Sequence, residues 1–221
     1  MGPRRFDAVL FDMDGVLVES EPWWNGVRVA FARDHGRSWS HEDEAACMGG
    51  NSREWALTMQ ERMGLHGMAV EAIQDAIVDG VVGCYRANPA PIIGDAPAQV
   101  RRIAAGRPVA IASSSHRDII NAAMEALGVR EVLGAIVSSD DVPRGKPEPD
   151  VYLLAASRLG VAPERCLVVE DSLNGIRAGK AAGMTVVLVP NASVPPAGSA
   201  REIADVIVGS LADLDPDALP G

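Results

Sequence analysis

The 221-residue sequence lacks several features that mark specialised protein classes. No apolar run approaches the roughly twenty residues that a transmembrane helix needs, so we expect no association with a membrane. The three cysteines, Cys47, Cys84 and Cys166, are odd in number and widely spaced, which predicts reduced thiols rather than a disulfide framework. The short apolar segment near the N-terminus is unlike a signal peptide, and we therefore expect a cytoplasmic protein.

Basic charge is also scarce in this sequence. Asp and Glu number 30 against 20 Lys and Arg, which gives a formal net charge of −10. Nucleic-acid binding usually requires a basic surface, so we expect no nucleic-acid partner, and an anionic small substrate would need a local cationic pocket. The 48% hydrophobic and 23% charged residues are ordinary for a globular protein and argue against disorder.

The segment from Phe6 to Val16 predicts a buried strand that ends at a reactive edge. Its apolar run stops at two carboxylates, Asp12 and Asp14, which are followed by Gly15. In extended backbone, residues two positions apart point to the same face, so these carboxylates project together. Adjacent carboxylates repel each other, and hard oxygen ligands suit Mg²⁺, so we expect a divalent cation to hold them.

A helical region follows the first strand. Apolar spacing and helix-start signals predict four helices, near residues 21–33, 40–47, 52–63 and 69–87. A segment of about seventy residues is too long for a loop in a compact domain. We therefore predict a small all-α domain at residues 18–88, inserted into an α/β core formed by residues 1–17 and 89–221.

Strands and helices alternate from residue 89 onward. This alternation predicts a Rossmann-like, doubly wound parallel sheet with helices on both faces. The predicted strands after the first are residues 109–112, 135–137, 167–169, 185–189 and 206–208. The loop from Asn191 to Ala200 is expected on the surface, without a role in chemistry.

Ligands of open parallel sheets bind at the carboxyl ends of the strands, and four of those ends carry reactive groups here. These groups are Asp12 with Asp14, Ser113 with Ser114, Lys146, and Glu170 with Asp171. A cation bound by carboxylates, with an ammonium group beside it, would neutralise an incoming phosphate dianion. The sequence therefore predicts a phosphoryl-transfer site.

Each of these residues can be given a role. Asp12 is the natural nucleophile, because it is ionised at neutral pH and carboxylates form aspartyl-phosphate intermediates. Asp14 would protonate the leaving alcohol and later deprotonate water, provided that its surroundings raise its pKa. Lys146 and Ser113 would contact the phosphate, and Ser114 would either make a weaker contact or cap the following helix.

The same motifs, in this order, resemble the four motifs of the haloacid dehalogenase superfamily. The matching segments are Asp12-Met13-Asp14-Gly15-Val16, Ser113, Arg144-Gly145-Lys146-Pro147-Glu148-Pro149 and Glu170-Asp171-Ser172. The all-α insert is similar to the smaller helical cap of that superfamily, as in its β-phosphoglucomutase-like sugar phosphatases. The resemblance implies Mg²⁺ bound by Asp12, the backbone carbonyl of Asp14, and Asp171, with Glu170 nearby, and a cap that closes over the substrate.

The second aspartate distinguishes the reactions of this superfamily. Its dehalogenases and phosphonate-cleaving members lack a counterpart of Asp14, and its β-phosphoglucomutases carry a histidine near the position of Trp23-Trp24. The resemblance thus implies a phosphatase for a small phosphorylated metabolite, with a sugar phosphate as the expected substrate. A phosphosugar mutase and a non-catalytic ligand-binding or regulatory module are the alternatives.

Substrate specificity is expected in the cap. Arg53, after a glycine turn, resembles the sugar- or phosphate-contacting arginine of the group, although an exposed position on its helix fits the pattern nearly as well. Trp24 either packs within the cap or faces the cleft. A monomer is expected.

Overall fold

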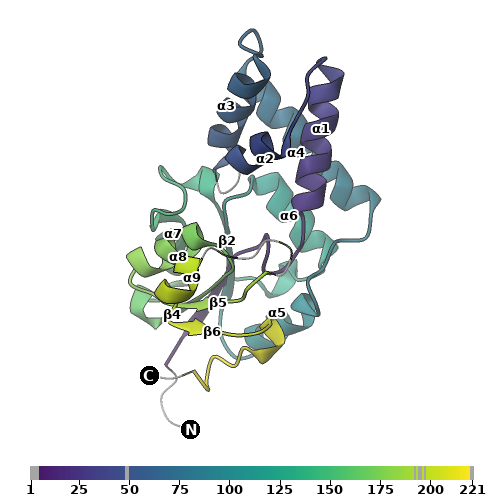
Figure 1. Ribbon diagram of the computed structural model, residues 1–221. Helices are drawn as coiled ribbons and strands as arrows, with labels where there is room; N and C mark the ends of the chain where they lie inside the picture. The colour runs from purple at the N-terminus through teal and green to yellow at the C-terminus, as the bar shows by residue number, and fades with distance from the viewer. Residues whose placement is uncertain (1–4, 48–49, 192, 194–195, 197, 220–221) are drawn as a thin grey trace.

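A six-stranded, all-parallel sheet forms the core of the protein in the computed structural model, which describes residues 5–47, 50–191, 193, 196 and 198–219 (Figure 1). The strand order is β3-β2-β1-β4-β5-β6. The strands are β1 (Ala8–Phe11), β2 (Val109–Ser113), β3 (Ala135–Ser138), β4 (Cys166–Glu170), β5 (Thr185–Leu188) and β6 (Val206–Ile207). The predicted doubly wound sheet is confirmed.

The central strand β1 pairs with β2 on one side and with β4 on the other. Val9, for example, lies opposite Val109 in β2 and Leu167 in β4. The chain builds outward from β1 to β3, and then continues on the other side of β1 with β4. The carboxyl ends of β1 and β4 therefore flank the switch point, where ligands of such sheets bind.

Helices cover both faces of the sheet, which explains why β1 is apolar at every position. Val9 packs in one core cluster with α5 (Ala96–Ala104) and α6 (Arg117–Ala126). Leu10 packs in the other with α7 (Asp150–Leu159), α8 (Leu173–Ala181) and α9 (Gly198–Ile203). Successive strand side chains point to opposite faces, so a doubly covered strand needs apolar residues throughout.

Four helices inserted after β1 form a separate layer at one end of the molecule (Figure 1). They are α1 (Glu21–Asp34), α2 (His41–Cys47), α3 (Ser52–Met63) and α4 (Val70–Ala87). The predicted helical cap is thus confirmed, although positions 48–49 lie outside the described residues. The domain limits of 18 and 88 stay a prediction.

The cysteines and the lengths of the helices bear on two expectations from the sequence, reduced thiols and no membrane-spanning segment. Cys47, Cys84 and Cys166 are free thiols. Among the described residues, no helix combines the length and the apolar character that crossing a bilayer requires.

Candidate active site

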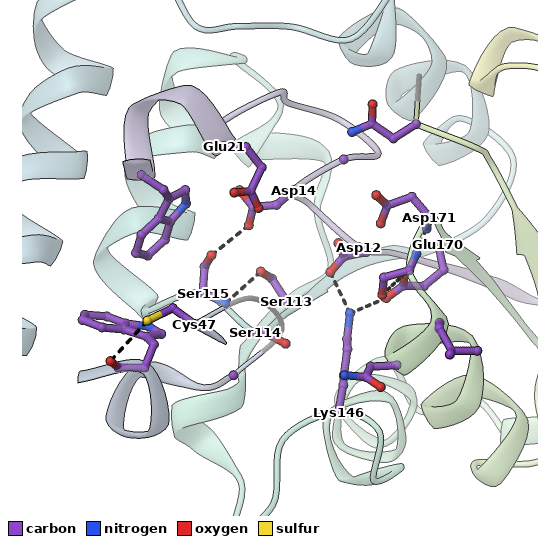
Figure 2. A pocket seen from close by; sticks show the side chains of 18 of the residues that line it. Asp12, Asp14, Glu21, Cys47, Ser113, Ser114, Ser115, Lys146, Glu170 and Asp171 are labelled. Carbon is purple, nitrogen blue, oxygen red and sulfur yellow. Dashed lines mark hydrogen bonds and ion pairs between the residues drawn. The ribbon is translucent and has the colours of Figure 1, made fainter. Parts of the chain in front are cut away.

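The four reactive strand ends converge on one cavity of about 280 Å³, as predicted (Figure 2). Its floor is built by residues at the carboxyl ends of β1, β2 and β4 and by the loop before α7. The residues predicted to act as nucleophile, acid, phosphate contacts or metal ligands all line this cavity: Asp12, Asp14, Ser113, Ser114, Lys146, Glu170 and Asp171. Segments more than 130 positions apart in sequence thus meet because parallel strands end at the same edge.

Lys146 links two carboxylates at the centre of the site. Its Nζ donates to Asp12 Oδ1 at 2.6 Å and to Glu170 Oε1 at 2.7 Å (Figure 2). Burial opposes the charged form of the amine, but Asp12 and Glu170 outweigh it and raise the pKa of Lys146 well above its usual value. The ammonium group is therefore a fixed positive charge beside Asp12.

Glu170 holds this lysine and is itself held by the surrounding chain. Its Oε1 also accepts a hydrogen bond from the Tyr152 hydroxyl at 2.9 Å. Its Oε2 accepts from the backbone N–H of Asp171 and of Ser172, and from the Ser172 hydroxyl, each at 2.9 Å. Burial raises the pKa of Glu170, but Lys146 and these donors outweigh it and lower the pKa. Tyr152 was not among the predicted site residues.

Three buried carboxylates form a candidate metal centre. One oxygen from each of Asp12, Glu170 and Asp171 lies within 4.8 Å of the others. Burial is the main cause that raises the pKa of Asp12 to about 7, and burial and Glu170 raise that of Asp171 to about 9. Lys146 supplies one positive charge against three potential negative ones. A hard divalent cation such as Mg²⁺ fits this set of oxygen donors, because it would neutralise the excess negative charge of the three carboxylates.

Asp14 lies apart from the lysine and has its own hydrogen-bond donors. Its carboxylate accepts hydrogen bonds from the Ser20 hydroxyl and, at 2.8 Å, from the Ser115 hydroxyl. Burial nevertheless raises the pKa of Asp14 above its usual value. Asp12 and Asp14 therefore have different surroundings, as an attacking group and a proton-transferring group require.

The loop after β2 is fixed by the end of the neighbouring strand. The hydroxyls of Ser138 and Ser139 donate to the backbone carbonyls of Ser115 and Ser114, at 2.7 and 2.8 Å. Within the loop, the Ser113 hydroxyl accepts from the N–H of Ser115 at 3.0 Å. These contacts keep three serines at the cavity edge. Ser115, which was not among the predicted site residues, supports Asp14 through its hydroxyl.

Two close approaches in the site require glycine. Gly15 has a φ of +83°, and a Cβ atom there would lie 2.0 Å from Oδ2 of Asp171. A Cβ atom at Gly175 would lie 1.5 Å from Oε1 of Glu170. Both glycines thus make room for an acidic side chain of the β4 edge.

The cap closes the cavity from the opposite side. Its lining residues include Trp24, as one reading of the sequence allowed, together with residues that sequence reasoning did not select: Glu21, Arg28, Cys47, Gly50 and Trp55. The predicted specificity residue Arg53 does not line the cavity. Its side chain is exposed and pairs with Glu71 of α4 at 3.2 Å.

The loop after β5 contributes to the site, contrary to the expectation of a surface loop without a role. Asn191 is buried and lines the cavity, as does Pro196. Positions 192, 194–195 and 197 of this loop lie outside the described residues. Polar, proline-rich composition predicted a loop over residues 191–200, but residues 198–200 form the start of α9. Composition also carries no information about which way a loop folds.

The family model for haloacid dehalogenase-like hydrolases matches residues 6–183. The chain belongs to this family. The match spans strands β1 to β4 of the core and the helical cap, and it includes every residue of the predicted motifs.

The curated relatives of this haloacid dehalogenase-like hydrolase include several phosphatases. Hexitol phosphatase B of Escherichia coli K12 is 29% identical over 222 residues, which cover 99% of each chain. Fructose-1-phosphate phosphatase YqaB of the same organism is 31% identical over 83% of this chain and 96% of the relative. The bifunctional riboflavin kinase/FMN phosphatase of Arabidopsis thaliana is 33% identical over 94% of this chain, which spans 54% of that longer protein.

A solved structure agrees with the family assignment. The crystal structure of CbbY from Rhodobacter sphaeroides, in complex with phosphate, superimposes with a TM-score of 0.79. The two chains are 28% identical, and the match covers 97% of this chain and all of CbbY. The core, the cap and their order along the chain are therefore shared.

Proposed function

We propose that this haloacid dehalogenase-like hydrolase is a Mg²⁺-dependent phosphatase acting on the monophosphate esters of small sugars or sugar alcohols. The observation that carries the proposal is the separation of two aspartates in one cavity. Asp12 lies 2.6 Å from the ammonium group of Lys146, whereas Asp14 is held by two serine hydroxyls. This arrangement suits a nucleophile beside a phosphate-binding charge and a separate group that transfers protons.

The reaction follows from these positions. An oxygen of Asp12 attacks phosphorus, the ester P–O bond breaks, and Asp14 donates its proton to the departing alkoxide. Asp14, now ionised, takes a proton from water as that water attacks the phosphorus of the aspartyl phosphate. Inorganic phosphate leaves and Asp12 is regenerated, so that protons and bonds balance over the cycle.

Lys146, Ser113 and Ser114 are the groups that we assign to the transferring phosphate. Lys146 is a permanent positive charge at the site, and Ser113 lies at the end of β2 beside the N-terminus of α6. Positive charge and hydroxyl donors aimed at a phosphate stabilise the charge that develops during transfer.

Asp12, Asp171 and the backbone carbonyl of Asp14 are assigned as the residues that would hold Mg²⁺. The ion supplies positive charge that offsets the carboxylates and the phosphate dianion. Glu170 is better placed to position Lys146 than to bind the cation. Its two oxygens already accept hydrogen bonds from the lysine, a tyrosine hydroxyl, two backbone N–H groups and a serine hydroxyl.

A sugar or sugar alcohol is proposed as the leaving group on two grounds. The cavity of about 280 Å³ lies at the lower limit of ligand pockets, which favours a small substrate. Two relatives that the chain covers over most of their length are named for hexitol phosphate and fructose-1-phosphate.

Released phosphate, measured over a panel of monophosphate esters with Mg²⁺, tests the proposal. The panel should cover hexose, hexitol, pentose and nucleoside phosphates, together with acetyl phosphate. We expect turnover of hexose or hexitol phosphates that EDTA suppresses and that added Mg²⁺ restores. Isomerised sugar phosphate in place of inorganic phosphate would indicate the mutase alternative, and no turnover of any ester would contradict an enzyme of this kind.

A further inference from the structure

One face of α1 is directed into the cavity. Glu21, Trp24 and Arg28 are spaced three and four residues apart, which places them on the same side of the helix, and all three line the cavity. Trp55 of α3 completes this part of the lining. We call these four residues the cap wall.

Arg28 is the most constrained residue of the cap wall. It is only 4% exposed, and its guanidinium forms an ion pair with the buried Glu44. The guanidinium carbon lies 4.9 Å from the ring centre of Trp24 and 5.7 Å from that of Trp55. Stacking on indole rings and a buried carboxylate partner fix the orientation of this side chain.

One donor of this fixed guanidinium has no partner. The Nε–H of Arg28 is buried and makes no hydrogen bond to any residue that the structure describes. The guanidinium stays protonated at all ordinary pH values, so this donor cannot be removed by deprotonation. A buried donor without a partner costs free energy, and a ligand hydroxyl in the adjoining cavity would satisfy it.

The charge of the cap wall argues against an anionic occupant. Glu44 balances the positive charge of Arg28, and its other oxygen accepts from Trp39 Nε1 at 2.6 Å. Glu21 adds a carboxyl group at the cavity. No uncompensated cation is therefore present among the cap residues that line the described part of the cavity. Indole faces, one donor and one carboxyl acceptor suit the C–H surfaces and hydroxyls of a polyol.

We propose that the cap wall binds an uncharged, polyhydroxylated leaving group, with the Arg28 Nε–H donating to one substrate hydroxyl. This inference rests on the proposed phosphatase function and narrows its substrates. Monophosphates of sugars or sugar alcohols fit it, whereas bisphosphates and phosphorylated carboxylic acids do not. Arg28, rather than Arg53, is then the cap arginine that determines specificity.

Arg28→Lys is the first test variant. Lysine keeps a positive charge for Glu44 but lacks the planar guanidinium and its Nε–H. We expect KM for fructose-1-phosphate or a hexitol phosphate to rise about tenfold or more, with a smaller change in kcat. Kinetics with acetyl phosphate, whose leaving group has no hydroxyl, should stay within about twofold of the wild type.

Arg33→Lys is the matched control, because it makes the same substitution at an exposed position of the same helix. Its KM values should equal those of the wild type. Melting temperatures establish that each variant is folded. Unchanged discrimination between sugar phosphate and acetyl phosphate in folded Arg28→Lys would overturn the proposal, and so would equal losses on both substrates.

A comparison on the wild-type enzyme does not depend on any variant. We expect kcat/KM for fructose bisphosphate to be at least about tenfold below that for fructose-1-phosphate, because the second phosphate would meet the carboxyl of Glu21. Equal or faster turnover of the bisphosphate would contradict an uncharged subsite. If the wild-type enzyme turned over none of these compounds, acetyl phosphate included, the result would instead contradict the proposed function.

Discussion

Gly175 lies directly against the Glu170 carboxylate, so closely that a Cβ atom at position 175 would lie 1.5 Å from Oε1. The first turn of α8 thereby positions the acidic group that holds Lys146 beside Asp12. Helix packing and catalysis are coupled through this contact. Adding one methyl group to the helix at position 175 should therefore alter the surroundings of the proposed nucleophile, Asp12.

Gly175→Ala should displace Glu170 and disturb the position of Lys146. We expect kcat to fall at least about tenfold, because a loss of about 1.4 kcal/mol of transition-state stabilisation corresponds to that factor. Gly83→Ala is the control, since a Cβ atom there would meet no described atom within 4 Å apart from its neighbours and the backbone of its own helix. It lies in α4, where alanine should leave activity intact and favour the helix. Full activity in a folded Gly175→Ala protein would refute the coupling.

Tyr152→Phe should lower stability, because the hydroxyl that is removed donates to the ionised Glu170 at 2.9 Å inside the core. Hydrogen bonds to charged groups contribute about 1.5–3 kcal/mol, and we expect a loss of unfolding free energy in that range. Denaturant unfolding measures it. Tyr85→Phe is the comparison, because its buried hydroxyl has no hydrogen-bond partner among the described residues. Equal losses in the two variants would argue against a special role for Tyr152.

Ser115→Ala removes a hydroxyl that donates to the Asp14 carboxylate at 2.8 Å. This hydrogen bond stabilises the ionised form, so its loss should raise the pKa of Asp14 further. A general acid must be protonated to act, and the alkaline limb of the kcat/KM profile should therefore move to higher pH. Ser157→Ala, at an exposed position of α7, should leave the profile unchanged. A shift to lower pH would contradict the assignment of Asp14 as the acid.

Glu21 makes a testable contribution to the pH dependence of stability. Burial, followed by the nearby Asp14, raises its pKa from 4.5 to about 7, while Arg28 acts in the opposite direction and Glu44 and Glu19 add to the rise. The folded state therefore binds this proton more tightly than the unfolded state does. The associated stability is present below about pH 4.5 and is lost as the pH rises through about 7.

Glu21→Gln removes this titration and should therefore raise the melting temperature relative to the wild type more at about pH 8 than at about pH 5. Thermal unfolding at the two pH values measures the difference. Glu61→Gln, at an exposed position of α3, should show no such pH-dependent gain. A gain for Glu21→Gln that is larger at about pH 5 would reverse the sign that the structure requires.

The sequence predicted the catalytic floor because parallel strands place their ends together. Asp12 follows a run of apolar residues, and Ser113 and Glu170 each end one, so the apolar runs were enough to predict that these side chains lie at the same edge of the sheet. The helical cap could also be predicted, since the segment between the first two strands is longer than any ordinary loop.

The supporting residues could not be predicted in the same way. Tyr152 has the pattern of a core residue, and only the packing of α7 shows that its hydroxyl meets Glu170. Arg28 lies one turn beyond Trp24 on α1, and this spacing places the two side chains on the same face of the helix. Its partner Glu44 comes from another helix, which the spacing within α1 does not predict. Arg53 follows a glycine turn as the family pattern suggests, yet its side chain is directed to Glu71 on the surface.

The central claim is that Asp12 is the nucleophile of a Mg²⁺-dependent phosphatase. Phosphate release by Asp12→Asn, measured with Mg²⁺ beside the wild type with and without EDTA, tests it most directly. Asp7→Asn is the matched control, because it makes the same change at the residue just before the same strand, where Asp7 pairs with Arg165. We predict activity in wild type and Asp7→Asn and none in Asp12→Asn or with EDTA. Turnover by a folded Asp12→Asn protein would contradict the account.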